Sequence, residues 1–434
     1  MEYLPEIHAA RNDARLLEEV YQAARRENEE SEFAASLLSC YQESPDNVLY
    51  AAWYYRLQQA AQEEQVERRG INWKLAVPLS VIAGLAFWLL SNPRFDFPDG
   101  VPYLVLLWAP LGACFVIAFL TISRRRYDTL SLLAILGLVG FGAYVTLFTT
   151  LGRGQYYPVL MAIHLPLLAW IAAGWSVLGP RSDDQNRFAF LIKSIEVFIT
   201  GGLYLMAGGA FAGIAVGMFS ALGITPSDEI MRQLAAGGAG LIPVLAVASV
   251  YDPRVSPIAQ RFEQGLGRLI STLMRLLLPL TLLVLIIYLF VIPFNFMEPF
   301  RRREVLIVYN VMLFAIMGLL IGATPMRARD PAPKYEWALR TGILAVVILT
   351  IVISLYALSA IVYRTLGGMT MNRLTVIGWN SINIGILVLL LYKQFKDGPA
   401  LWISSLQSVF SRATIAYIVW GVFLVLSVPL LFKG

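Results

Sequence analysis

Few ionisable residues fall inside the long apolar segments of this sequence, and they are the first candidates for chemistry. A charge in the hydrocarbon of a bilayer is costly, and such residues often serve transport or proton transfer. Lys193 and Glu196 stand three residues apart, so one helix face carries both and they can pair with each other. His164 has neither a second histidine nor a carboxylate within reach in the sequence. It is either a buried imidazole with satisfied hydrogen bonds or a site for a proton or a ligand.

Other polar residues and the known enzyme motifs add little chemistry. Asn310, Asn380 and Asn383 lie in apolar segments, where hydrogen bonds between helices are their expected role. Two histidines and two cysteines are too few, and too widely spaced, for a familiar metal pattern. The sequence also has no Gly-x-Ser-x-Gly elbow and no phosphate-binding P-loop. We therefore predict no catalytic residue, metal site or cofactor.

Arginines gather in two short segments that connect apolar runs, at 295–304 and 363–374. A guanidinium at the level of the lipid headgroups binds phosphate through two parallel hydrogen bonds. Glu298 and Glu304 can instead neutralise part of the first cluster. The cluster is therefore either internally paired or an anion site for a lipid headgroup or an acidic partner. The candidate residues are Arg301, Arg302, Arg303, Arg364 and Arg373.

Small residues form a stripe in the fifth apolar segment. Gly209, Gly213 and Gly217 make two overlapping Gly-xxx-Gly units, which permit close approach of helices. A second run of small residues, 235–240, opens the next segment. We expect tight packing within one bundle, while a homodimer seam or a thin wall along a substrate path remain alternatives.

The composition identifies the kind of protein that carries these residues. Of 434 residues, 58% are hydrophobic and 15% are charged, against about 45–50% and about 25% in soluble proteins. A helix needs about 20 apolar residues to cross a bilayer. The sequence therefore predicts an all-α polytopic membrane bundle, and it excludes a soluble enzyme. We expect about eleven spans, at 75–91, 102–122, 129–151, 157–179, 189–222, 232–250, 276–294, 304–323, 341–363, 374–393 and 414–432.

The first 70 residues differ from the rest, since they carry a net charge of −7 against +12 for residues 71–434. Apolar residues recur there at helical spacing, which predicts a small acidic head of three helices. The head is either a cap packed on itself or on the membrane domain, or a docking module for a protein partner. Because the positive charge belongs to loops at a membrane surface, we predict no nucleic-acid partner.

The distribution of Lys and Arg gives the orientation. With the head in the cytoplasm, the inner loops carry 17 Lys and Arg and the outer loops carry 9, as the positive-inside rule requires. Amphipathic helices near 256–275 and 399–411 are expected at the inner interface, as ordinary elbows or as lipid sensors. We therefore expect a cytoplasmic N-terminus and a C-terminus on the other side.

The segment that contains Arg364 and Arg373 also suggests a family. Gly368, Thr370, Asn372 and Arg373 match the C-terminal signature of a bacterial polytopic family known as domain of unknown function 4153. Met369 replaces a leucine of that signature, and Gly367 replaces an aromatic residue. This part of the chain, about spans seven to ten, resembles that family. The resemblance implies a multi-pass protein of the bacterial inner membrane and supplies no activity.

The expected function is non-catalytic: a membrane scaffold or accessory subunit that binds membrane lipids and, through its head, a protein partner. One alternative is a transporter or permease-like protein that uses the glycine-rich fifth and sixth spans. A second is a lipid-modifying membrane enzyme, which needs a cleft with convergent polar groups. A polar cavity that reaches the middle of the bilayer would favour the alternatives.

Overall fold

The computed structural model describes residues 3–27, 29–68, 71–97, 102–125, 128–152, 156–223, 227–262, 265–326 and 333–432. It divides the chain into two compact units, Met1–Ile71 and Asn72–Gly434. The described residues fold into helices, joined by turns and short connections, and one isolated β-bridge links Asp96 to Pro102. The structure confirms the predicted all-α class.

The described residues of the first unit form four helices, one more than the sequence predicts. They are α1 (Leu4–Ala9), α2 (Ala14–Glu27), α3 (Glu30–Glu43) and α4 (Val48–Arg68). Its core contains the fully buried side chains of Leu17, Phe33 and Tyr50. Asn47 begins α4, because its side-chain oxygen accepts hydrogen bonds from the backbone amides of Leu49 and Tyr50.

Eleven helices of the second unit, within the described residues, are long and apolar enough to cross a membrane. The chain is thus an integral membrane protein, and the number of spans agrees with the prediction. The helices are α5 (Trp73–Leu90), α6 (Tyr103–Arg124), α7 (Thr129–Thr150), α8 (Tyr157–Leu178), α9 (Asp184–Ala221), α10 (Asp228–Val250), α11 (Gly265–Val291), α13 (Arg303–Ala323), α14 (Pro333–Thr365), α15 (Met371–Asp397) and α16 (Trp402–Leu431).

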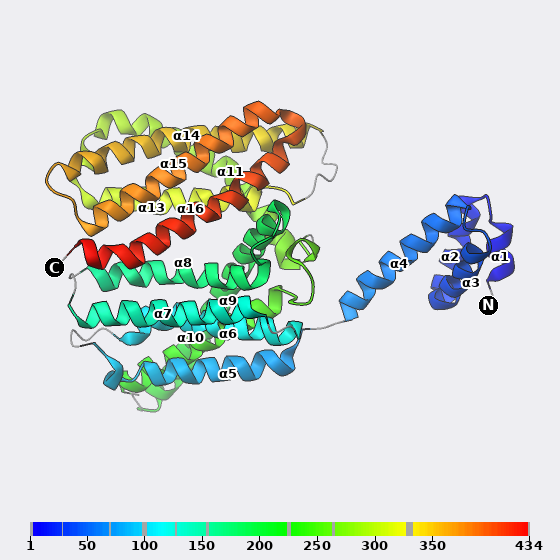
Figure 1. Cartoon of the computed structure of the whole chain (residues 1–434), viewed down its shortest axis with the longest axis horizontal. Helices are drawn as coiled ribbons and strands as arrows, with labels where there is room; N and C mark the ends of the chain where they lie inside the picture. The colour runs from blue at the N-terminus through cyan, green and yellow to red at the C-terminus, as the bar shows by residue number, and fades with distance from the viewer. Residues whose placement is uncertain are drawn as a thin grey trace. The chain divides into compact units, whose positions relative to one another are not determined.

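The membrane helices form two groups (Figure 1). In one group α10 packs on α5 and α6, and α8 packs on α6 and α7; in the other, α11, α13, α14 and α15 pack on one another. The long helices α9 and α16 contact each other, and α16 also contacts α8 and α15. These two helices therefore connect the groups.

Closely packed glycines occur between α5 and α10. A Cβ atom on Gly240 would lie 2.7 Å from Cγ of Phe87 and 2.9 Å from Cα of Gly84. Gly84 in turn approaches Gly237, whose carbonyl oxygen would lie 2.9 Å from a Cβ on Gly84. Gly237 and Gly240, in the middle of α10, therefore let two membrane helices approach at backbone distance.

The two expected interfacial helices differ from the observed ones. Near 256–275 the structure has a short 3-10 turn, Pro257–Ala259, and then α11, which runs without a break from Gly265 to Val291. Near 399–411 it has a 3-10 turn, Pro399–Leu401, that leads directly into α16. Trp402, Leu406 and Phe410 are buried. The apolar face of 399–411 therefore packs inside the bundle, whereas Leu269 and Leu273 of the first segment are exposed.

Candidate functional site

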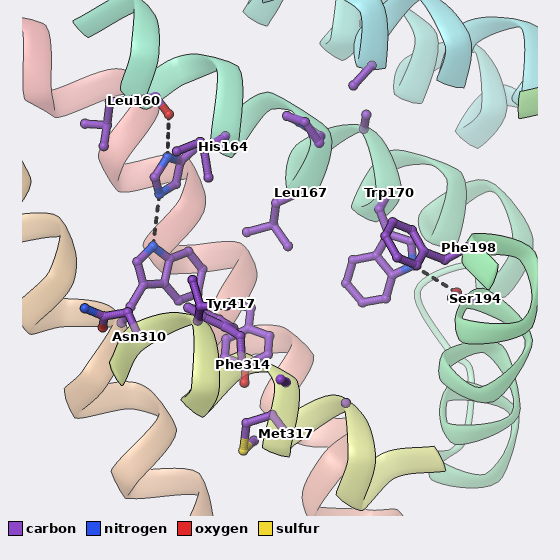
Figure 2. Close-up of a pocket in the computed structure, with 18 of the residues that line it drawn as sticks. Leu160, His164, Leu167, Trp170, Ser194, Phe198, Asn310, Phe314, Met317 and Tyr417 are labelled. Atoms are coloured by element: carbon purple, nitrogen blue, oxygen red, sulfur yellow. Dashed lines mark hydrogen bonds between the residues drawn. The ribbon is translucent and has the colours of Figure 1, made fainter. Parts of the chain in front are cut away.

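A cavity of about 2740 Å³ lies among the membrane helices. Its walls come from α5, α6, α8, α9 and α10 on one side and from α11, α13, α14, α15 and α16 on the other. The lining is mainly apolar, with Trp170, Phe198 and Phe314 among its aromatic side chains. Figure 2 shows these rings together with residues of α8, α9, α13 and α16 around the same space. Ligand sites for drug-sized molecules have volumes of about 300–1,000 Å³, so this cavity suits a larger apolar ligand.

Four arginines are the charged residues among the described lining of this cavity: Arg232, Arg303, Arg364 and Arg373. Each lies near a terminus of its helix, at the start of α10, α13 and α15 and at the end of α14. Because successive spans alternate in direction, these four helix termini lie at the same end of the bundle. We call it the arginine end. The cavity therefore has positive charge at one end and an apolar body.

The cavity extends far into the bundle from the arginine end. Trp170, which lines it, lies beyond the midpoint of α8. There its indole nitrogen donates a 2.9 Å hydrogen bond to the Ser194 hydroxyl of α9 (Figure 2). Ile321, which also lines it, is the third residue from the opposite end of α13, so the cavity extends along most of the length of the membrane helices.

Arg364 and Arg373 flank the turn between α14 and α15. Gly368 has a φ of +107°, a conformation that favours glycine, and the Thr370 hydroxyl accepts a hydrogen bond from the Arg373 amide to begin α15. The Arg373 guanidinium donates to the Gly368 carbonyl. Nη1 of Arg364 is buried and has no hydrogen-bond partner within the described chain. Arg364 also lines the cavity, so this guanidinium combines a buried nitrogen that has no acceptor with a place in the cavity wall.

The three consecutive arginines have different surroundings. Arg303 lines the cavity, whereas Arg301 and Arg302 are outside its lining. Nε of Arg302 lies 3.1 Å from Oε2 of Glu298 in an exposed ion pair. Of the five predicted arginines, the structure therefore brings Arg303, Arg364 and Arg373 to one cavity.

One ion pair at the cavity is not predicted by the sequence. Arg232 in α10 donates two hydrogen bonds to the carboxylate of Asp96, one of them 2.9 Å long. Asp96 lies between α5 and α6, and its hydrogen bonds from Arg232 lower the pKa of its carboxyl group. Because 136 residues separate the partners, sequence spacing gives no sign of the pair.

The imidazole of His164 has partners on both nitrogens (Figure 2). Nδ1 lies 2.7 Å from the Leu160 carbonyl oxygen, and the indole nitrogen of Trp379 lies 2.9 Å from Nε2. An indole can only donate, so Nε2 accepts and Nδ1 carries the proton. A neutral imidazole satisfies both bonds, and this geometry supports the interpretation of His164 as a buried, satisfied side chain.

The three asparagines occupy different environments. Asn310 lines the cavity and donates to the Leu306 carbonyl of its own helix, not to another helix as expected. Asn383 accepts a hydrogen bond from the Tyr417 hydroxyl, which joins α15 to α16. Asn380 is buried, and its amide nitrogen has no partner within the described chain.

Lys193 and Glu196 form a buried ion pair outside the large cavity. Nζ of Lys193 lies 2.7 Å from Oε2 of Glu196, and both residues are less than a tenth exposed. Nζ also lies 5.1 Å from the centre of the Phe262 ring. Glu196 lines a second, smaller cavity of about 500 Å³.

The glycine stripe of α9 is not packed against the bundle. A Cβ atom on Gly209, Gly213 or Gly217 would have no neighbour within 4 Å in the described chain. Phe211 between them is 75% exposed. The expectation of tight packing inside the bundle is therefore incorrect for these residues, because no other helix lies opposite this part of α9.

The described residues contain no cluster of three or more His, Cys, Asp or Glu side chains placed to hold a metal ion. The chain matches no known family model, no curated protein and no solved structure.

Proposed function

We propose that this integral membrane protein binds an anionic lipid in the large cavity, as a non-catalytic scaffold or accessory subunit. The observation that supports it is the combination of a long apolar cavity with arginines at one end. Acyl chains gain about 0.8 kcal/mol for each buried CH₂ group, and guanidinium groups bind phosphate oxygens at short range. The shape and the charge distribution therefore fit a lipid whose phosphate lies beside Arg364 and Arg373.

The location and the partners belong to the same proposal. We infer a bacterial inner membrane from the resemblance of 363–374 to domain of unknown function 4153, and a cytoplasmic head from the charge of the loops. In this proposal the head is the module that binds a protein partner. A lipid-modifying enzyme has less support, because the charged residues of the described cavity lining are arginines, which bind an anion but do not act as a general base at neutral pH.

The test compares two pairs of arginines. The full chain is purified with its bound lipids, and the lipids are identified by native mass spectrometry. Arg364→Gln/Arg373→Gln removes two cations of the cavity, whereas Arg301→Gln/Arg302→Gln removes two from the neighbouring segment outside it. We expect wild type and the second variant to retain anionic phospholipid, and the first variant to retain several-fold less. Equal retention by all three proteins would overturn the proposal.

A second measurement separates lipid binding from binding of free phosphate. Inorganic phosphate is added to the purified protein at rising concentration, and the retained phospholipid is measured. If the apolar chains provide most of the affinity, phosphate should displace little of the lipid. Complete displacement at millimolar phosphate would show an anion site without an acyl-chain site.

A further inference from the structure

The second cavity lies at the end of the bundle opposite the arginine end. It is formed by the N-terminal parts of α11, α14 and α16, by the end of α13 with residues 324–326, and by α9. In contrast to the large cavity, it has charged side chains of both signs, among them Glu196, Arg268, Arg275 and Glu336. Such a lining suits a polar group that enters from water.

The two cavities approach each other closely. Ile195 of α9 lines both of them. On α11, Met274 lines the large cavity and Arg275 the small one; on α13, Ile321 lines the large cavity and Gly322 the small one. Adjacent residues of two helices therefore face different cavities, and the wall between the cavities is about one side chain thick.

Met274 and Gly322 close this wall. A Cβ atom built on Gly322 would lie 2.9 Å from Cγ and 3.5 Å from Cβ of Met274. The absence of a side chain on Gly322 thus makes room for Met274 between α11 and α13. Methionine has three rotatable side-chain bonds and repacks easily. A rotation of this one side chain would remove the contact of Met274 with Gly322 in the wall.

We propose that the two cavities are the halves of one path, closed at Met274 and Gly322, along which an anionic phospholipid moves between the leaflets. This inference rests on the proposed function, because the large cavity is its lipid site. In the path, the phosphate passes from Arg364 and Arg373 to Arg268 and Arg275 while the chains stay in apolar surroundings. The lipid moves down its own concentration gradient between the two leaflets, and no other reactant is consumed.

Cationic side chains lie at both ends of the path. Moving a bare phosphate through hydrocarbon is costly, and cations at both ends lower the cost at the two resting positions. At the second cavity Lys193 and Glu196 form a buried pair, and a Cβ atom on Gly267, next to Arg268, would lie 3.3 Å from the Glu196 carboxylate. This pair adds polar groups to the second resting position without adding net charge to it.

The test locks the wall with a disulfide. The distance of 3.5 Å between Cβ of Met274 and a Cβ on Gly322 falls in the range of about 3.5–4.5 Å found in disulfides. Met274→Cys/Gly322→Cys is made in a chain with Cys40→Ala and Cys114→Ala. The full chain is reconstituted in vesicles that contain phosphatidylglycerol with a fluorescent headgroup. Dithionite, which stays outside, bleaches only probes that reach the outer leaflet.

We expect reduced protein to expose the inner-leaflet probe, oxidised protein to behave like protein-free vesicles, and fresh reductant to restore the movement. Met274→Cys alone should not respond to oxidation. Met274→Ala, which needs no disulfide, should move lipid several-fold faster than wild type.

Three results would overturn the inference: no movement with wild type, movement that oxidation of the linked pair leaves unchanged, or an equal rate for Met274→Ala and wild type. The lipid retained on purification is measured in the same proteins. Arginine-dependent retention without transbilayer movement would leave the proposed lipid binding intact and remove only the path.

Discussion

The indole nitrogen of Trp379 in α15 donates a hydrogen bond to Nε2 of His164 in α8, and this bond crosses from one group of membrane helices to the other. Both side chains line the large cavity. Both are buried, so water does not compete for the bond. The pair therefore joins two walls of the cavity that are 215 residues apart in sequence.

Replacing Trp379 with Phe should lower the thermal stability of the purified protein. The change keeps an aromatic ring and removes the donor, which leaves Nε2 of His164 without a partner. The loss of such a bond costs about 1 kcal/mol. The matched control is Trp108→Phe in α6, because Trp108 lines the same cavity but is 44% exposed. A Trp379→Phe melting temperature equal to that of the control would show that the bond does not stabilise the fold.

A second prediction compares two glycines. Gly240→Ala places a Cβ atom 2.7 Å from Phe87, and such overpacking costs about 1–3 kcal/mol, so the melting temperature should fall. Gly213→Ala places its Cβ in open space and should leave the melting temperature unchanged. Size-exclusion chromatography of both variants also tests the homodimer alternative. A smaller particle for Gly213→Ala would assign the stripe of α9 to a contact between copies.

The number of spans could be predicted from the sequence, because each apolar run of about 20 residues is long enough for one helix to cross the bilayer. Their ends could not, since α9, α11 and α14 continue beyond the apolar run into polar residues. The pair of Lys193 and Glu196 follows from a spacing within one helix. The pairs of Arg232 with Asp96 and of Trp379 with His164 connect distant helices, and only the packing of the bundle reveals them. Gly-xxx-Gly spacing shows that a helix permits close approach, but it does not show whether another helix lies opposite.

The ion pair of Asp96 and Arg232 predicts a dependence of stability on pH. Its hydrogen bonds hold the Asp96 pKa below the ordinary value of 3.8, so the ionised carboxylate stabilises the fold at neutral pH. This contribution is lost as the pH falls through the lowered pKa. Asp96→Asn should therefore melt below wild type at pH 7, and the difference should shrink below pH 3.8. A difference that stays constant over that range would mean that the pair contributes no charge-dependent stability.

The proposed orientation predicts where the two ends of the chain lie. If all eleven helices that are long and apolar enough among the described residues cross the membrane, the two ends lie on opposite sides, and the loop charges favour a cytoplasmic N-terminus. A fluorescent protein that matures only in the cytoplasm should report from an N-terminal fusion and stay dark after α16. Alkaline phosphatase, which folds only outside, should give the reverse. Signals from the same compartment at both ends would contradict the odd number of spans.

The last prediction concerns the buried pair of Lys193 and Glu196. Lys193→Met leaves a carboxylate that is 7% exposed without its cation, and breaking a buried pair in this way costs about 3–5 kcal/mol. Lys193→Met/Glu196→Leu removes both charges, and apolar replacements of similar volume are often tolerated. We therefore expect the single variant to melt well below the double variant.

Arg412→Met is the control for that comparison, because Arg412 pairs with Asp184 at the surface and exposed pairs contribute about 0–1 kcal/mol. Its melting temperature should stay close to that of wild type. If the single and double variants of the buried pair melt together, the carboxylate of Glu196 is not held in place by Lys193. The pair would then lose its proposed role in the second cavity, while the contact between Met274 and Gly322 would be unaffected.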